Sequence, residues 1–152
     1  MLKRAIPKIL FLIAVAVATS CSNTSDDTSF DEVFRVTNPS GNIDAVVVET
    51  NGGATTSFGY EVFVKPKGEK VTKGEAVAAF YGAVRSETAY GVNIKWVRPD
   101  QLAIEYLKAK RTDFTKQNVI VNGETVTISS RSSVNDESAP PGGMLYNLEK
   151  KK

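Results

Sequence analysis

The chain of 152 residues contains no histidine and only one cysteine, Cys21. Without histidine, neither a Ser-His-Asp nor a Cys-His catalytic arrangement can be built. A zinc site would have to use carboxylates alone, which is unfavourable for that metal, and a single cysteine cannot form a disulfide within the chain. The acidic residues do not cluster at the spacing of a calcium-binding loop. These absences predict a protein that is not an enzyme and holds no metal or cofactor.

The sequence also lacks an apolar run long enough to span a bilayer. Residues 9–18 form an apolar run of ten residues, whereas a membrane-spanning helix needs about 20. Three basic residues precede this run, at positions 3, 4 and 8, and small residues follow it up to Cys21. A basic segment, a short apolar core and a small-residue cleavage site make up an export signal, so residues 1–20 are predicted to be a cleaved signal peptide.

The expected cleavage site lies between Ser20 and Cys21. The segment Ala18-Thr19-Ser20-Cys21 resembles the lipobox of bacterial lipoprotein signals, with alanine where leucine is usual. The resemblance implies that Cys21 becomes the first residue and carries diacylglycerol and an N-acyl chain such as palmitate, and two or more acyl chains make a durable anchor. Ser22 in place of an aspartate implies the outer membrane, facing the periplasm, in a Gram-negative cell. The alternative is an ordinary secretory signal that leaves Cys21 as a free thiol.

Removal of the signal changes the charge balance of the chain. The 19 basic and 17 acidic residues of the whole sequence become 16 and 17, a net charge of −1. A near-neutral domain gives no reason to expect a nucleic-acid partner, which requires a concentrated basic face. Residues 21–32 are polar and are predicted to be a lipidated flexible tether, and residues 131–152 a flexible C-terminal segment in which 144–148 could dock back as a short strand.

Between the two flexible segments, residues 33–130 show short β-type runs separated by turn residues. Residues 78–84 are ambiguous between helix and strand, and we favour a strand. The charged link 108–116 is expected to be exposed. The predicted fold class is mostly β, a single small antiparallel β-meander domain whose sheet curls on itself or is covered by one short helix. The predicted strands are 33–36, 43–50, 60–64, 78–84, 92–96, 102–106, 119–121 and 124–128.

The sharpest local signal is Asn122-Gly123 between two β-rich runs. This dipeptide is the strongest short hairpin signal, because both turn positions require positive φ. A two-residue loop pairs Val121 with Glu124 and, two residues further along each strand, Val119 with Val126.

Two other hairpins resemble those of a β-propeller blade. Residues 38–49 are similar to the pattern S-P-D-G-x-x-I-A, and residues 96–104 to W-x-x-D-x-x-L-x-I. The mature chain is too short to close a propeller. The closer resemblance is to small bacterial lipoproteins that carry a domain of unknown function with a Gly-Ala-Thr-Thr element, here within Gly52-Gly53-Ala54-Thr55-Thr56-Ser57-Phe58. It covers roughly Val36 to Tyr106, and it implies a fold and a location but no chemistry.

The best candidate binding site is the loop 51–59. Gly52 and Gly53 allow close approach of a ligand or another backbone, and Thr55 and Thr56 offer hydroxyls. The alternative, which we favour, is a glycine bulge whose threonines satisfy turn amides. Most of the aromatic side chains are expected in the core, with Tyr90 as the exception that could face a partner.

Two functions remain open at this stage. The first is a non-catalytic envelope lipoprotein that binds a protein or peptide, for example through an edge strand. The second is a small hydrolase or carbohydrate-binding protein that uses carboxylates, for which Asp44 and Glu105 are an example of a pair. Two carboxylates about 5–9 Å apart in a cleft would favour the second, and an exposed apolar patch without a cleft the first.

Overall fold

The computed structural model describes residues 28–86 and 89–135. The predicted signal peptide, the cleavage site at Ser20 and Cys21, the first part of the tether and the segment 144–148 lie outside the described residues. Within the described part no helix occurs, and so none is long and apolar enough to cross a membrane. The strands are β1 (Ser29–Thr37), β2 (Ile43–Asn51), β3 (Gly59–Pro66), β4 (Ala78–Tyr81), β5 (Arg85–Ser86), β6 (Ala89–Tyr90), β7 (Val92–Arg98), β8 (Gln101–Tyr106), β9 (Arg111–Phe114), β10 (Asn118–Val121) and β11 (Glu124–Arg131).

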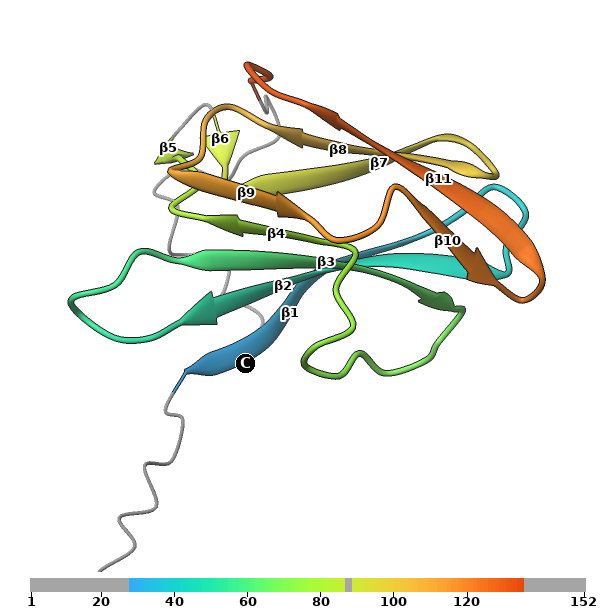
Figure 1. Ribbon diagram of the computed structural model, residues 1–152, viewed down its shortest axis with the longest axis horizontal. Coiled ribbons are helices and arrows are strands. Elements are labelled where there is room, and N and C mark those ends of the chain that lie inside the picture. Colours follow the sequence, from blue (N-terminus) through green and yellow to red (C-terminus); the bar gives the residue numbers. More distant parts are fainter. Residues whose placement is uncertain (1–27, 87–88, 136–152) are drawn as a thin grey trace, which may run out of the picture.

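The strands form two sheets that pack face to face (Figure 1). One has five strands in the order β1-β2-β3-β4-β9, the other has four in the order β10-β11-β8-β7, and β5 and β6 form a small ribbon beside them. One apolar cluster takes side chains from both sheets, for example Val47 and Val62 from the first and Ile104 and Val126 from the second. The mostly β, antiparallel class that the sequence predicts is therefore confirmed.

The order of the strands departs from a simple meander. The predicted exposed link 108–116 contains β9, which pairs with β4 at the edge of the first sheet although its side chains are mostly exposed. The chain then crosses to the second sheet, where β11 lies parallel to β8. Both pairings join segments more than 20 residues apart, so no local pattern could indicate them. The curled single sheet is thus replaced by two stacked sheets.

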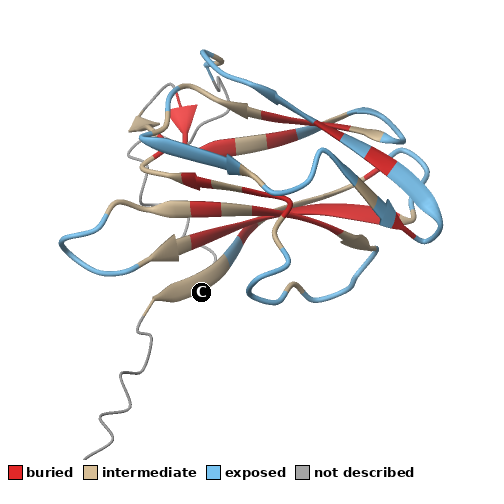
Figure 2. Ribbon diagram, viewed as in Figure 1, coloured by how far each residue is buried: buried red, intermediate tan, exposed pale blue. Residues whose placement is uncertain are grey.

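Strand periodicity explains the core. In β3, Tyr60, Val62 and Val64 face the other sheet, as their alternation predicts, while Phe63 faces outward. Phe63 is nevertheless fully buried, because the connection between β3 and β4 folds over it and supplies Val71 and Ala76 to a second, smaller apolar cluster. Buried segments therefore run through the middle of both sheets (Figure 2).

Most strands begin or end one to four residues away from the predicted boundaries, and β11 extends to Arg131, the first residue of the predicted flexible C-terminal segment. β1 begins at Ser29, so the prediction of a tether over residues 21–32 is wrong for residues 29–32, which belong to the sheet and pair with the end of β2. The segment 78–84 is a strand and not a helix, but β4 ends at Tyr81 because Gly82 turns the chain with a φ of 61°. β5 and β6 were not predicted, because each has only two residues.

The hairpin at Asn122-Gly123 is confirmed. Asn122 has a φ of 52° and Gly123 a φ of 80°, the two positive values that a type I′ turn requires. Val121 pairs with Glu124 and Val119 with Val126, the predicted register.

Candidate functional site

The loop 51–59 uses its polar groups on itself. The Asn51 side chain accepts a hydrogen bond from the Gly53 N–H at 2.9 Å, and both the N–H and the hydroxyl of Thr56 donate to the Gly53 carbonyl at 3.1 Å. Gly53 has a φ of 99°, which suits glycine. These contacts of Asn51, Gly53 and Thr56 are those of a structural turn.

Ser57, near the end of this loop, is hydrogen-bonded to β4 and to Lys110, the residue before β9. The Ser57 N–H donates a hydrogen bond to the Tyr81 hydroxyl at 3.0 Å, and the Lys110 ammonium donates to the Ser57 hydroxyl at 2.8 Å. The hydrogen bond from Ser57 lowers the pKa of Tyr81, with the nearby cations acting in the same direction. The loop is thus held at the end of the sheet where β9 begins.

The sequence suggests that Tyr90 is exposed and could face a partner. In the structure Tyr90 is instead buried, with 9% of its surface exposed. Its ring lies 4.9 Å from the Arg85 guanidinium, which donates a hydrogen bond to the Tyr90 hydroxyl at 3.2 Å. The reason is the β5–β6 ribbon, which places Arg85 opposite Tyr90 in register. The contacts that the structure describes for Tyr90 are those with Arg85 and Glu49.

Arg85 belongs to a buried polar cluster that the sequence did not indicate. Its guanidinium pairs with Glu49 of β2 at 3.2 Å and packs on the Phe58 ring at 4.1 Å, and the Tyr90 hydroxyl donates to the same carboxylate at 3.4 Å. Glu49 is 4% exposed, and burial raises its pKa although Arg85 opposes this shift. Burial also raises the pKa of Tyr60, which is close to the Glu49 carboxylate. The buried ion pair between Arg85 and Glu49 therefore attaches the β5–β6 ribbon to the five-stranded sheet.

The carboxylates Asp44 and Glu105 are not brought together. Asp44 lies at the start of β2, next to Asn42, which donates a hydrogen bond to Glu124 at the start of β11. Glu105 instead pairs with Arg131 at the far end of β11. At about 3.3 Å per strand residue, the two carboxylates are on the order of 20 Å apart. They cannot act on one substrate.

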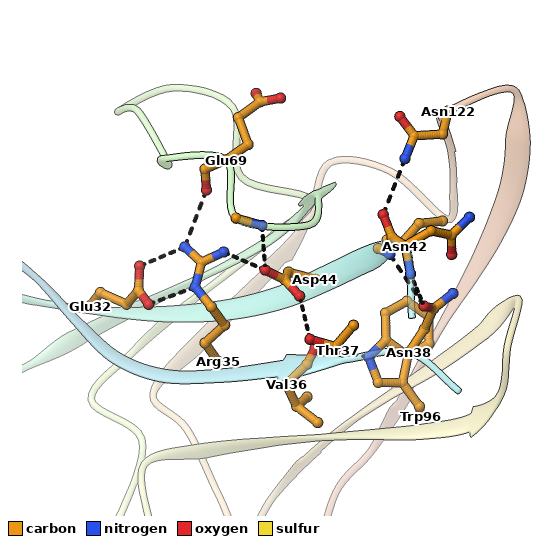
Figure 3. Close-up of polar contacts among 12 residues, drawn as sticks. Glu32, Arg35, Val36, Thr37, Asn38, Asn42, Asp44, Glu69, Trp96 and Asn122 are labelled. Atoms are coloured by element: carbon orange, nitrogen blue, oxygen red, sulfur yellow. Dashed lines mark hydrogen bonds and ion pairs between the residues drawn. The ribbon is translucent and has the colours of Figure 1, made fainter. Parts of the chain in front are cut away.

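Asp44 is held by a dense set of contacts (Figure 3). It is 2% exposed and accepts hydrogen bonds from Arg35 at 2.7 Å, from the Thr37 hydroxyl at 2.7 Å and from the Gly68 N–H at 2.9 Å. Burial alone would raise the pKa of Asp44, but these three hydrogen bonds outweigh it and leave the pKa below its ordinary value. Arg35 also binds Glu32 through two hydrogen bonds. The cluster ties β1 and β2 to the chain that follows β3.

A second set of contacts at the same end joins the two sheets (Figure 3). The Asn38 amide accepts from the N–H groups of Asn42 and Ile43 and donates to the Pro99 carbonyl in the β7–β8 turn at 3.0 Å. The Trp96 indole donates to the Val36 carbonyl at 3.1 Å. Asn38 and Trp96, which lie in the two segments that resemble propeller hairpins, therefore join β1 of one sheet to β7 and the turn that follows it in the other.

A hollow of about 160 Å³ lies on the outer face of the five-stranded sheet. Two rows of paired residues cross its floor and walls: Thr50, Gly59, Tyr81 and Arg111 in one, and Glu61, Ala79 and Asp113 in the other. The floor is low because it is made by Gly59 and Ala79. A Cβ at Gly59 would collide with the Thr50 hydroxyl, which would have to shift to make room for it. No local sequence pattern indicates this hollow, because its residues come from four strands.

The edges of the sheets differ in how they are protected. β1 and β7 each have an irregular register, at Val33 and at Val97, and β9 carries the charged residues Arg111 and Asp113. Bulges and charges of this kind discourage pairing with another strand. β10 has neither: its sequence is Asn-Val-Ile-Val, and its register is regular. Ile120 is 74% exposed.

The free edge of β10 carries backbone groups in a regular pattern. In a two-residue hairpin, the pair next to the turn exchanges hydrogen bonds and the following pair does not. Val119 and Val121 therefore bond to β11, while the N–H and C=O groups of Asn118 and Ile120 point to the free edge. The Ile128 N–H donates to the Gln117 carbonyl at 2.8 Å, which continues this alternation.

Among the described residues, no three His, Cys, Asp or Glu side chains are grouped so that they could hold a metal ion. Comparison with protein-family models, with curated proteins and with solved structures finds nothing that matches this chain.

Proposed function

We propose that this chain is a non-catalytic lipoprotein of the cell envelope that binds an extended segment of another protein along β10. The observation that carries the proposal is the unprotected edge of β10, which contrasts with the bulged or charged edges of β1, β7 and β9. Natural sheets usually block such an edge, because it pairs readily with any other strand. An edge that is left open is therefore suited to strand addition.

Strand addition would use both the backbone and the side chains of β10. Outward N–H and C=O groups of Asn118 and Ile120 supply main-chain hydrogen bonds, which give affinity in this mode of recognition. Ile120 adds an exposed apolar side chain on the solvent face, while Val119 packs against the core and fixes the strand in place. A partner segment with apolar residues at alternate positions fits this surface.

Substitution of Ile120 tests this edge. We expect Ile120→Lys to reduce partner capture at least tenfold, because the lysine would bring a charge into an interface that is otherwise apolar. The measurement is the yield of protein adducts from a photocrosslinking amino acid placed at Asn118, with the chain in its native membrane. Among the residues that the structure describes, Val97 is the other large exposed apolar residue, at 46% exposure, and it lies on the opposite edge of the same sheet.

Val97→Lys is therefore the matched control, and it should leave the adduct yield unchanged. Equal yields in the Ile120→Lys and unsubstituted chains would contradict binding along β10, and so would the absence of any protein adduct from position 118.

The anchor rests on the signal and on Cys21. We expect Cys21→Ser to yield an uncleaved or soluble chain, because the lipid attachment point is lost and a single apolar run of ten residues is too short to span the bilayer. Membrane fractionation together with the intact mass of the chain measures this. If Cys21→Ser partitioned into the membrane at the mature mass, the lipid anchor would be refuted.

A further inference from the structure

The hollow on the outer face of the five-stranded sheet is lined largely by polar and charged side chains, unlike the apolar edge of β10. Its walls carry two carboxylates, Glu61 and Asp113, on either side of Ala79 in one row of the sheet. Strands lie about 4.8 Å apart, so the two α-carbons are separated by roughly 10 Å. This spacing leaves room between the carboxylates for one small ring.

Neither carboxylate takes part in the contacts that stabilise the described part of the fold. Within the described residues, Glu61 and Asp113 form no hydrogen bond and no ion pair, unlike Asp44, Glu49 and Glu105. Glu61 is partly buried, and this burial raises its pKa, with only the Lys73 charge acting against the shift. A partly desolvated carboxylate without a hydrogen-bond donor is costly, and a ligand that donates to it would recover that cost.

The rest of the lining narrows the class of ligand. Arg111 lies 5.9 Å from the centre of the Tyr81 ring and adds a cation with several donors, while Thr50 adds a hydroxyl. An anion would meet two carboxylates, a cation would meet Arg111, and an apolar ligand would leave Glu61 without a donor. A neutral ligand with several hydroxyls can donate to the carboxylates and accept from the guanidinium at the same time.

We propose that this hollow binds one sugar ring of a carbohydrate, whose hydroxyls donate hydrogen bonds to Glu61 and Asp113 and accept them from Arg111. The volume of about 160 Å³ suits a single ring and not a longer chain. The site is open, so the rest of an oligosaccharide can extend into solvent. Binding here is independent of strand addition at β10.

The test is a ligand-observed NMR titration of the full chain, purified in a detergent that contains no sugar. Glucose, galactose and N-acetylglucosamine are the probes, and at least one should bind with a millimolar dissociation constant. Glu61→Gln removes the charge but keeps the shape, and should weaken binding about ten- to hundredfold, the usual value of hydrogen bonds to a charged group. Ala79→Leu fills the floor and should abolish binding.

Thr125→Leu is the control, because it adds the same side chain at an exposed strand position of the other sheet. It should bind the sugar as the unsubstituted chain does. The proposal is overturned if none of the three sugars binds, or if Glu61→Gln and Ala79→Leu both bind normally. It is also overturned if a lysine ester binds in competition with the sugar at lower concentration, which would make the hollow a site for cations.

Discussion

Replacement of Asp44 by asparagine is expected to lower the free energy of unfolding by about 3 kcal/mol. The buried carboxylate accepts from Arg35, Thr37 and the Gly68 N–H, and an amide nitrogen in place of one oxygen would face these donors. The substitution also removes one of the carboxylates that pair with the Arg35 guanidinium. Because Arg35 is partly exposed, this adds only a limited loss of stability. Denaturant unfolding of the full chain measures the difference.

Glu32 supplies a matched control for Asp44. It binds the same guanidinium through two hydrogen bonds, but its side chain is 41% exposed. Exposed ion pairs contribute about 0–1 kcal/mol, so Glu32→Gln should cost much less than Asp44→Asn. Equal losses for the two variants would show that burial of Asp44 is not what stabilises this end of the sandwich.

The pH dependence provides a second check on Asp44. Its pKa in the folded chain lies below the ordinary value of about 3.9, so its contribution is fully present above pH 4 and is lost as the pH falls through the folded-state pKa. Glu49 acts in the opposite sense, because its raised pKa favours the folded chain as the pH falls. Asp44→Asn should therefore reduce the loss of stability below pH 4, whereas a loss as steep as that of the unsubstituted chain would assign it to other groups.

Gly91→Ala is expected to be similarly destabilising, by about 3 kcal/mol. Gly91 has a φ of 57°, and a Cβ at this position would overlap the ring of Tyr60, which is fully buried in the core. Left-handed backbone costs a non-glycine residue roughly 1–2 kcal/mol, and overpacking of a core costs roughly 1–3 kcal/mol more. The measurement is again the free energy of unfolding.

Gly123→Ala separates the two causes. Gly123 also has a positive φ, of 80°, but open space lies around the position of its Cβ. It should therefore cost only the backbone part, about 1 kcal/mol. In a Tyr60→Leu background, Gly91→Ala should lose part of its effect, because the ring is gone. Equal costs for the two glycines, or no coupling with Tyr60, would refute the steric explanation.

The parts of the fold that the sequence predicts are those with a local pattern. The strand faces of β3 follow from alternation, and the β10–β11 hairpin follows from the φ requirement of Asn122-Gly123. β9 escaped prediction because its residues, Arg-Thr-Asp-Phe, have the composition of a loop. Its place in the sheet depends on pairing with β4, and the parallel contact of β11 with β8 likewise depends on distant residues.

The candidate sites show the same division. The turn in the loop 51–59 is made by neighbouring residues, because Asn51, Gly53 and Thr56 form its hydrogen bonds. The burial of Tyr90 could not be predicted, since the β5–β6 ribbon that buries it has only two residues in each strand and packs its hydroxyl against Glu49, 41 residues away in the sequence. The edge of β10 and the hollow at Gly59 could not be predicted, because each depends on which strand lies beside which.

The start of β1 at Ser29 limits the reach of an anchored molecule. Only seven residues separate Cys21 from this strand, and a fully extended chain of that length covers about 25 Å. Ser29 pairs with Asn51, so the tether joins the domain at one end of the sandwich. The β10–β11 turn, which contacts Asn42, lies at the other end. If Cys21 carries the proposed lipid, the domain can therefore move only within a limited distance of the bilayer surface. A partner would have to come within this distance to pair with β10.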